Sequence, residues 1–252
     1  MPIDYPIFYL AAIPAVILVG LAKGGFAGVG VLAMPLLALV MPPIRAASIM
    51  LPVLILQDAI SLWFYRRTFD RQNLAIMVPG ACIGIGLGYV FASYVSDAAI
   101  EFAVGIIAVV FAARHLLHLR KTDHEPKRGH PVLGVFWGGV AGFVSMIANA
   151  GAPPFQVYVL PQRLPRDVFV GTGVFFFAAV NWIKTPAFFA LGLFTRENLA
   201  TSMVLLPLAA FATWLGVWLV RRVSVERFYK IIYATMAVVG LKLIYDGLSG
   251  LL

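Results

Sequence analysis

Apolar residues dominate this chain in runs of about 20, separated by short segments that carry charge, glycine or proline. A helix needs about 20 apolar residues to cross the hydrocarbon core of a bilayer. Ten segments are predicted, at 6–22, 26–41, 46–65, 74–94, 98–118, 132–148, 151–161, 168–191, 199–220 and 227–249. The segments 26–41 and 151–161 are short for a span, so we expect half-helices or re-entrant arms there.

Two of the apolar stretches contain several glycines followed by proline. The first runs from Lys23 to Pro35, and the second comprises Gly138 to Phe143 followed by Asn149 to Phe155. Both should interrupt a helix, and such a break must be buried in protein or line a polar cavity, because unpaired N–H and C=O groups are costly in hydrocarbon. Paired breaks in two halves of a chain predict a transporter's binding site, since the N-termini of half-helices favour an anion.

The ten segments divide five and five around the hydrophilic stretch 120–131. Three short matches recur in the same order in both halves: 34–36 with 153–155, 69–74 with 194–199, and 88–96 with 216–224. We therefore predict an all-α polytopic membrane protein with two repeats, 1–119 and 132–252, each containing discontinuous or re-entrant helices. Five segments in each half would invert one repeat relative to the other, which is a common plan for secondary transporters.

Composition agrees with this membrane class. The chain is 62% hydrophobic and 12% charged, against roughly 25% charged residues in soluble domains. Its formal net charge of +8 is not a nucleic-acid signal, because the basic residues lie in short clusters between the apolar runs. Most of the Lys and Arg residues fall on one side if both termini lie on the other. We therefore expect the linker 120–131 in the cytoplasm and both termini outside.

Several kinds of chemistry have no sequence signal. The single cysteine, Cys82, has no partner for a disulfide or a thiolate metal site, and no HExxH or Cys/His spacing occurs, so no metal or cofactor is expected. No P-loop is present, which favours an ion or proton gradient as the driving force. Residues 1–6 lack the basic region of a cleavable signal peptide, so we expect the first apolar run to be retained.

Four groups of residues resemble the sulfite exporter TauE/SafE family of membrane permeases. They are the break from Gly24 to Pro35, the break ending Gly151 to Pro154, the stretch Phe169 to Gly173, and Lys184. The likeness covers nearly the whole chain. It implies a secondary transporter, acting as an exporter, of small sulfur-containing anions such as sulfite, thiosulfate or organosulfonates (sulfoacetate). It also implies a place in a bacterial-type cytoplasmic (inner) membrane.

Two charged residues stand out inside the predicted spans. Lys184 lies well within 168–191, where an ammonium costs about 2.5–3.5 kcal/mol or more at the bilayer centre, and an intramembrane lysine is a functional-site hypothesis by default. A snorkelling lysine or a structural ion pair is the alternative. Asp58 is the only carboxylate deep in a predicted span. It either pairs with Lys184 or titrates and couples transport to protons.

A sulfur oxyanion accepts several hydrogen bonds, so backbone N–H groups at the breaks and polar side chains nearby are expected to bind it. The candidate substrate-binding residues are Lys184, Gly25, Gly28, Gly30, Gln57, Asn149, Gly151, Thr172 and Asn181. For each polar side chain the alternative is a hydrogen bond between helices.

The predicted mechanism is alternating access around one midplane anion site. The expected partners are a small anion, the lipid bilayer and a coupling proton or ion, with no nucleic acid, and the oligomeric state stays open. The main rival is an anion channel or a permease for other small organic anions. An intramembrane enzyme would need a nucleophile–base pair within the spans, and a membrane scaffold that senses the anion would bind it without flux.

Overall fold

The computed structural model describes residues 3, 5–26, 29–91, 94–118, 129–219 and 226–251, and these form helices without strands. The elements are α1 (Pro6–Gly24), η1 (Val29–Leu32), α2 (Ala33–Ala38), α3 (Pro43–Tyr65), α4 (Arg71–Phe91), α5 (Asp97–His118), α6 (Pro131–Ala148), α7 (Ala152–Val159), η2 (Leu160–Gln162), α8 (Arg166–Ala190), α9 (Arg196–Leu219) and α10 (Glu226–Leu251). Each of the ten predicted segments is confirmed as a helical segment. Residues 120–128 of the predicted linker lie outside the described residues.

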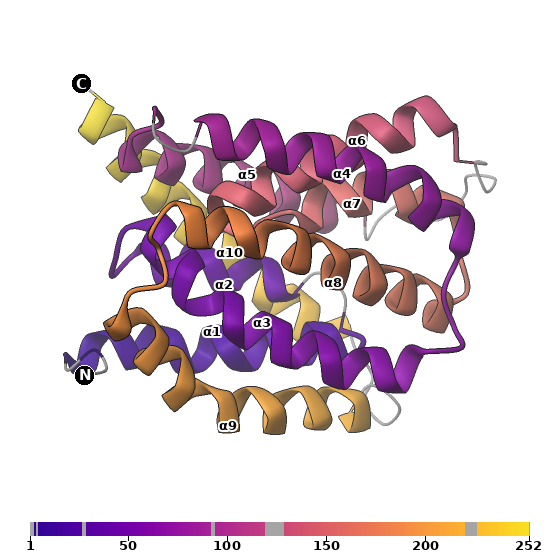
Figure 1. The fold of residues 1–252 in the computed structure, drawn as a ribbon, viewed down its shortest axis with the longest axis horizontal. Coiled ribbons are helices and arrows are strands. Elements are labelled where there is room, and N and C mark those ends of the chain that lie inside the picture. Colours follow the sequence, from indigo (N-terminus) through magenta and orange to yellow (C-terminus); the bar gives the residue numbers. More distant parts are fainter. Residues whose placement is uncertain are drawn as a thin grey trace.

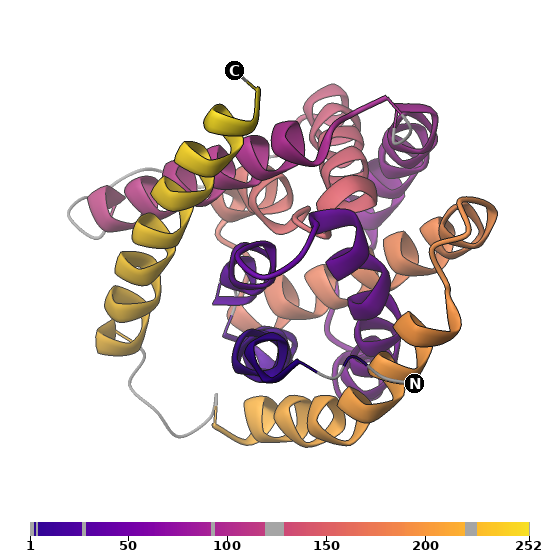
Figure 2. The same ribbon diagram turned by 90° about the vertical axis from the view of Figure 1, so that its left-hand side faces the viewer.

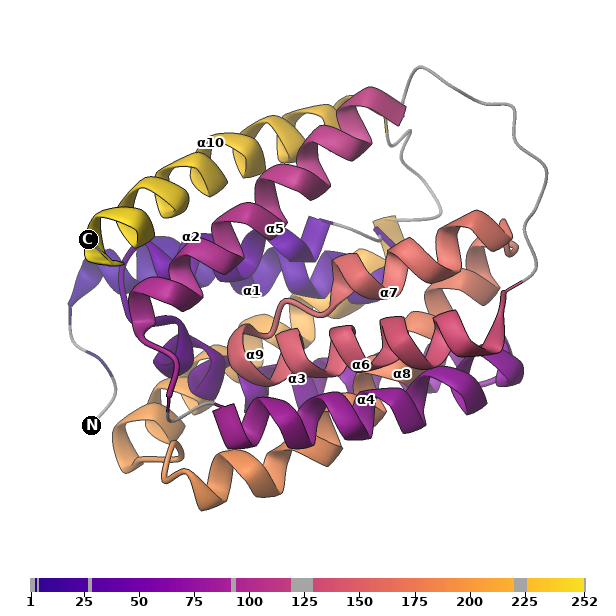
Figure 3. The ribbon, with the colours of Figure 1, turned by 90° about the horizontal axis from the view of Figure 1, so that it is seen from above.

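Successive helices run in alternating directions along the long axis of the molecule (Figure 1). The helix α1 begins and α10 ends at the same end, which we call the terminal end (Figures 1 and 3). At the opposite end, here called the linker end, α5 ends and α6 begins (Figure 3). In this bundle the first helix, α1, begins at the terminal end, and α6 begins at the linker end (Figure 3).

Both predicted breaks are present, and each is made by a residue with positive φ. Helix α1 ends at Gly25, whose φ of 125° is readily adopted only by glycine. Helix α6 ends at Asn149, which takes the left-handed conformation with φ of 51°, a conformation that asparagine tolerates better than most residues. The segments that follow are short, as predicted. Helix α2 lies in the terminal half of the bundle and α7 in the linker half (Figure 3).

A small set of helix pairs accounts for most of the packing. Helix α1 packs on α9 and α6 packs on α4, while α3 contacts both α8 and α9 and α8 also contacts α4. Helices α5 and α10 pack on each other at one side of the bundle (Figure 2). Consequently α3 and α8 lie inside the bundle and carry buried polar side chains, among them Gln57, Asp58, Thr172, Asn181 and Lys184.

Glycine allows the closest helix pairs to approach at backbone distance. A Cβ added at Gly84 of α4 would lie 1.9 Å from the carbonyl oxygen of Gly139 in α6. At the contact of α1 and α9, a Cβ at Gly24 would lie 2.2 Å from the carbonyl carbon of Gly216. Small residues at such crossings favour van der Waals packing of helices in lipid, where burial of apolar surface adds little.

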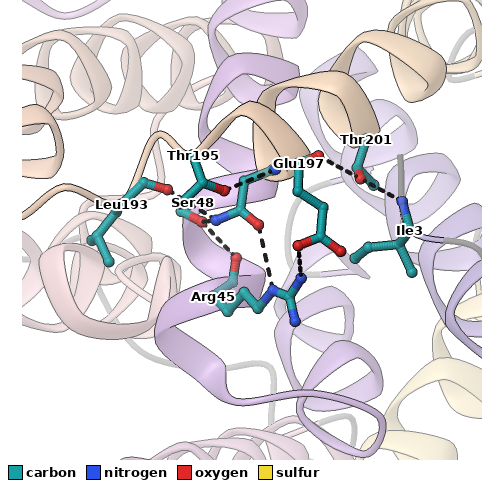
Figure 4. Close-up of polar contacts among 8 residues, drawn as sticks. Ile3, Arg45, Ser48, Leu193, Thr195, Glu197 and Thr201 are labelled. Carbon is teal, nitrogen blue, oxygen red and sulfur yellow. Dashed lines mark hydrogen bonds and ion pairs between the residues drawn. The ribbon is translucent and has the colours of Figure 1, made fainter. Parts of the chain in front are cut away.

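At the terminal end, a polar cluster joins the start of α3 to the start of α9 (Figure 4). Arg45 forms an ion pair with Glu197 at 2.8 Å and donates from Nε to Asn198 Oδ1 at 3.4 Å. Asn198 donates from Nδ2 to Ser48 Oγ and to the Leu193 carbonyl, both at 2.9 Å. These contacts hold α3 and α9 together at this end.

Six helices are long and apolar enough to cross a bilayer, judged over the described residues by length and composition. They are α1, α3, α4, α6, α8 and α9. Helix α5 carries a shorter apolar stretch, Ala98–Val110.

Candidate functional site

A cavity of about 130 Å³ lies where the two helix breaks meet. Gly30 lines it just after the first break, and Ala152 lines it at the start of α7, after the second. The elements η1 and α7 also contact each other directly. The two breaks, about 120 residues apart in the sequence, therefore border one site.

The cavity has polar and apolar walls. Its polar side chains come from four helices: Lys23 of α1, Ser145 and Asn149 at the end of α6, Gln156 of α7 and Asn181 of α8. The apolar wall includes Leu54, Phe155, Phe169, Val170, Val174 and Phe177. A low-dielectric wall of this kind strengthens the electrostatic interactions of any charge held beside it.

Lys23 and Asp58 form an ion pair at the edge of this cavity. The Asp58 side chain is 1% exposed and that of Lys23 is 11% exposed. The second carboxylate oxygen, Oδ2, accepts a hydrogen bond from Asn181 Nδ2 at 2.6 Å. One carboxylate thus joins α1, α3 and α8.

Of the two alternatives for Asp58, an ion pair with Lys184 or proton coupling, the first is wrong, because the ion pair is made with Lys23. Lys23 is the partner because it stands one residue before the end of α1, which contacts α3, so its long side chain reaches the carboxylate. In the sequence, Lys23 is one of the basic residues whose distribution predicts the topology, and it also begins the first glycine break. Its position next to the glycine break was the available sign of a role at the site.

Lys184 is fully buried in protein. Its Nζ donates to the Ser145 carbonyl at 3.3 Å, to Ser145 Oγ at 3.1 Å and to Asn149 Oδ1. Full burial excludes a lysine that reaches the bilayer surface. All three acceptors are neutral, so among the described residues no carboxylate pairs directly with this ammonium. Both acceptor residues, Ser145 and Asn149, line the cavity.

Asn149 and Asn181 are the predicted polar residues that line the cavity. Asn149 ends α6, accepts from Lys184 and donates from Nδ2 to the Ala47 carbonyl of α3 at 3.0 Å. It thereby fixes the second break against α3. Asn181 is held by Asp58.

Gln57 and Thr172 do not line the cavity and instead make hydrogen bonds to neighbouring segments. Gln57 Nε2 donates to the Val16 carbonyl of α1 at 3.2 Å and to the Ala209 carbonyl of α9 at 3.4 Å. Thr172 Oγ1 accepts from the Asp70 amide at 2.8 Å and donates to Val168. For these two residues the structure favours the alternative considered from the sequence.

The candidate glycines have different positions. Gly30 lines the cavity, Gly25 ends α1, and Gly28 lies outside the described residues. Gly151 precedes α7, and a Cβ there would lie 2.6 Å from the Ala141 carbonyl oxygen, so this position requires the absence of a side chain.

The first turn of α7 offers few backbone donors, because Pro153 and Pro154 have no N–H group. Gly151 and Ala152 retain theirs. The anion site expected from helix N-termini therefore depends more on side chains at the second break than the glycine pattern suggested.

Two further cavity residues, Ser145 and Gln156, were not among the candidates. Ser145 precedes Asn149 by four residues, a spacing that places both on one helix face. Gln156 follows Pro153-Pro154-Phe155, within the second turn of the half-helix. The polarity of Gln156 in an apolar half-helix was the signal that could have identified it.

The arrangement suits binding of a small anion. Near the cavity there are two lysines, Lys23 and Lys184, and one carboxylate, Asp58, which pairs with Lys23. The remaining polar groups are amides and a hydroxyl. Among the described residues no group of three or more His, Cys, Asp or Glu side chains is placed to hold a metal ion.

A family model described as Sulfite exporter TauE/SafE matches residues 12–243, from within α1 to within α10. No curated protein and no solved structure gave a significant match.

Proposed function

The chain belongs to the sulfite exporter TauE/SafE family and is a multi-pass membrane protein, and on this premise we propose that it exports small sulfur-containing anions. The proposed substrates are sulfite, thiosulfate and organosulfonates such as sulfoacetate. The observation that carries the proposal is the cavity at the meeting of the two breaks, beside a buried lysine whose acceptors are all neutral.

Charge balance supports an anionic substrate. Lys23 and Lys184 lie near the cavity with Asp58 as their neighbouring carboxylate, so there is one positive charge in excess whenever Lys184 is protonated. A buried charge without a counter-ion costs several kcal/mol. An anion in the cavity would offset that cost, whereas a cation would increase it.

The donors available to the anion favour reversible binding. Lys23 is already engaged by Asp58, and Asn149, Asn181 and the Ala152 N–H are neutral. Neutral donors bind an oxyanion less tightly than a cluster of arginines, which form strong bidentate pairs. Moderate affinity permits release on the other side of the membrane.

Alternating access is the proposed mechanism, with the halves 1–119 and 132–252 acting as inverted repeats. If α1 to α5 are matched in order with α6 to α10, the α1–α9 contact corresponds to the α6–α4 contact. The α3–α9 contact likewise corresponds to the α8–α4 contact. The α5–α10 contact corresponds to itself. The half-helices α2 and α7 run toward opposite ends of the bundle (Figure 3). These relations support two repeats that rock around one site.

The lining residues indicate from which end of the bundle the site is accessible in this conformation. Phe169 and Val170, in the first two turns of α8, line the cavity, and α8 begins at the linker end (Figure 1). At the terminal end the Arg45–Glu197 cluster joins α3 to α9. With the linker in the cytoplasm and the termini outside an inner membrane, the site would be reached from the cytoplasm, where an exporter collects its substrate.

Asp58 is the proposed coupling residue. Protonation of its carboxylate would remove the negative charge that engages Lys23 and free this ammonium for the anion. Anion and proton would then bind together, so an inward proton gradient would oppose export and the outward gradient of the anion itself would drive it. An Asp58→Asn protein should accordingly lose the dependence of transport on a proton gradient while retaining exchange of anions.

Anion counterflow in proteoliposomes tests the proposed function. Purified protein is reconstituted, the vesicles are loaded with unlabelled sulfite, thiosulfate or sulfoacetate, and entry of the same ³⁵S-labelled anion is followed. A transporter gives saturable entry that the internal anion accelerates. The Cys82→Ser protein, changed at an exposed position of α4, should behave like the wild type and serves as control.

Two results would contradict the proposal. Flux that rises in proportion to concentration and ignores the internal anion would identify the rival, an anion channel. Folded protein that moves none of the three anions would remove the substrate class, and simple carboxylates would then test the permease for other small organic anions.

A further inference from the structure

Gln156 differs from the other polar side chains of the cavity in its hydrogen bonding. Lys23 and Asn181 are held by Asp58, and Ser145 and Asn149 by Lys184. Gln156 is 5% exposed and lines the cavity. Within the described residues, no hydrogen bond to its side-chain amide is found.

The amide atoms of Gln156 are not among the fully buried unpaired side-chain atoms of the described residues, so they keep accessible surface at the cavity, where a bound molecule can pair with them. Gln57 provides a comparison. It is also buried and has an unpaired Oε1, but its Nε2 bonds to α1 and α9 and it lies away from the cavity. Gln57 therefore has a structural task, whereas the Gln156 amide has none among the described protein groups.

The position of Gln156 on α7 gives its amide a specific place. Ala152 and Gln156 are four residues apart, and both line the cavity, as expected for one face of a helix. Side chains on a helix lean toward its N-terminus. On this rule we expect the Gln156 side chain to lean toward the turn where Pro153 and Pro154 lack N–H donors.

We propose that Gln156 is a substrate-binding residue whose Nε2 donates a hydrogen bond to an oxygen of the transported oxyanion. The amide replaces the donors that the two prolines remove, and it does so without adding charge. The anion thereby contacts α7 through Gln156 and α1 through Lys23, the elements on either side of the two breaks. This inference rests on the proposed function and identifies a ligand of the same site.

The test compares the wild type with Gln156→Met, which keeps a similar length and removes the hydrogen-bonding groups. Full-length protein in detergent is titrated with sulfite, thiosulfate and sulfoacetate, and the dissociation constant is taken from the concentration dependence of the melting temperature. Loss of one hydrogen bond to a charged ligand should raise the dissociation constant about ten- to a hundredfold. The melting temperature without anion should stay about equal, because the Gln156 amide makes no hydrogen bond to a described protein group that the substitution could remove.

Two further variants sharpen the result. Gln156→Glu places a carboxylate where the anion binds and should weaken binding more than Gln156→Met does. Gln57→Met is the matched control, a buried glutamine outside the cavity. Its melting temperature should fall because the bonds to Val16 and Ala209 are lost, with an unchanged dissociation constant.

The outcomes distinguish this inference from the function on which it rests. An anion that binds the wild type and Gln156→Met equally overturns the role of Gln156 and leaves the proposed function intact. A lower melting temperature of Gln156→Met with unchanged affinity would assign Gln156 a structural role and also overturns the inference. If none of the three anions stabilises the wild type, the proposed function fails, and the inference fails with it. Should Gln156→Met not fold, equal affinity of Gln156→Glu and wild type overturns it.

Discussion

The ionisable residues beside the cavity are two lysines and one carboxylate, and this inequality is the main feature of the site. Lys23 has a carboxylate partner in Asp58, whereas Lys184 has neutral acceptors on Ser145 and Asn149. Exposed ion pairs contribute little to stability, but a buried pair becomes strongly destabilising once one member is removed. The ion pair and the unpaired lysine should therefore respond differently to substitution.

Replacing Asp58 by Asn should destabilise the protein without anion and strengthen its response to anion. Both lysines then lack a carboxylate, and loss of one member of a buried pair costs about 3–5 kcal/mol. Thermal unfolding in detergent should show a lower melting temperature and a larger upward shift on addition of a bound anion. The double variant Lys23→Met/Asp58→Asn should recover part of the stability. An Asp58→Asn protein that melts like the wild type would show that the pair contributes nothing.

At this scale the sequence predicts which residues are unusual but not what they contact. Lys184, Asn149 and Asn181 are identifiable because polar groups are rare in apolar segments, and the structure places them at or beside the cavity. Their partners depend on how distant helices pack. For that reason the sequence paired Asp58 with the wrong lysine, and it assigned Gln57 to the site although its amide bonds to α1 and α9.

The helices and their breaks were the most predictable elements. Glycine, asparagine and proline act on the backbone locally, so Gly25 and Asn149 end α1 and α6 without help from distant contacts. The loss of two backbone N–H donors in the first turn of α7 also follows from the sequence, because proline has none. Its relevance to the site depends on the position of the cavity, which the sequence does not show. Which helices pack together could not be predicted, since almost every face is apolar.

Glycine at the crossing of α4 and α6 allows a direct prediction. Gly84→Ala would place a Cβ 1.9 Å from the Gly139 carbonyl oxygen, while a Cβ at Gly86, on the same helix, meets nothing within 4 Å. Gly84→Ala should force the helices apart and sharply lower the melting temperature. Gly86→Ala should leave it unchanged or raise it slightly, because alanine favours helix over glycine by about 1 kcal/mol. Equal melting temperatures of the two variants would contradict the close packing of α4 and α6.

At the scale of the whole molecule, the described chain begins and ends at the same end of the bundle (Figure 3). The helices α1 and α10 meet the terminal end, and α5 and α6 meet the linker end (Figure 3). The side of the membrane that each end faces is still a prediction from Lys and Arg positions. The inverted relation of the halves is likewise a proposal, supported by the exchangeable helix contacts.

Cysteine labelling tests this orientation. In a Cys82→Ser background, which removes the single cysteine, Ser96→Cys marks the terminal end between α4 and α5 and His130→Cys marks the linker end, just before α6. A membrane-impermeant maleimide should label Ser96→Cys in intact cells. It should label His130→Cys only after the membrane is permeabilised. The reverse pattern would place the linker outside and require the opposite direction of access.

The central claim is that the two helix breaks form one anion site whose excess charge comes from Lys184. It is tested most directly by thermal unfolding of the wild type and of Lys184→Met, each with and without sulfite, thiosulfate and sulfoacetate. At least one anion should raise the melting temperature of the wild type in a saturable way. Lys184→Met should remain folded and lose that shift. An unchanged shift in Lys184→Met would contradict the account, because the site would then bind its anion without the lysine.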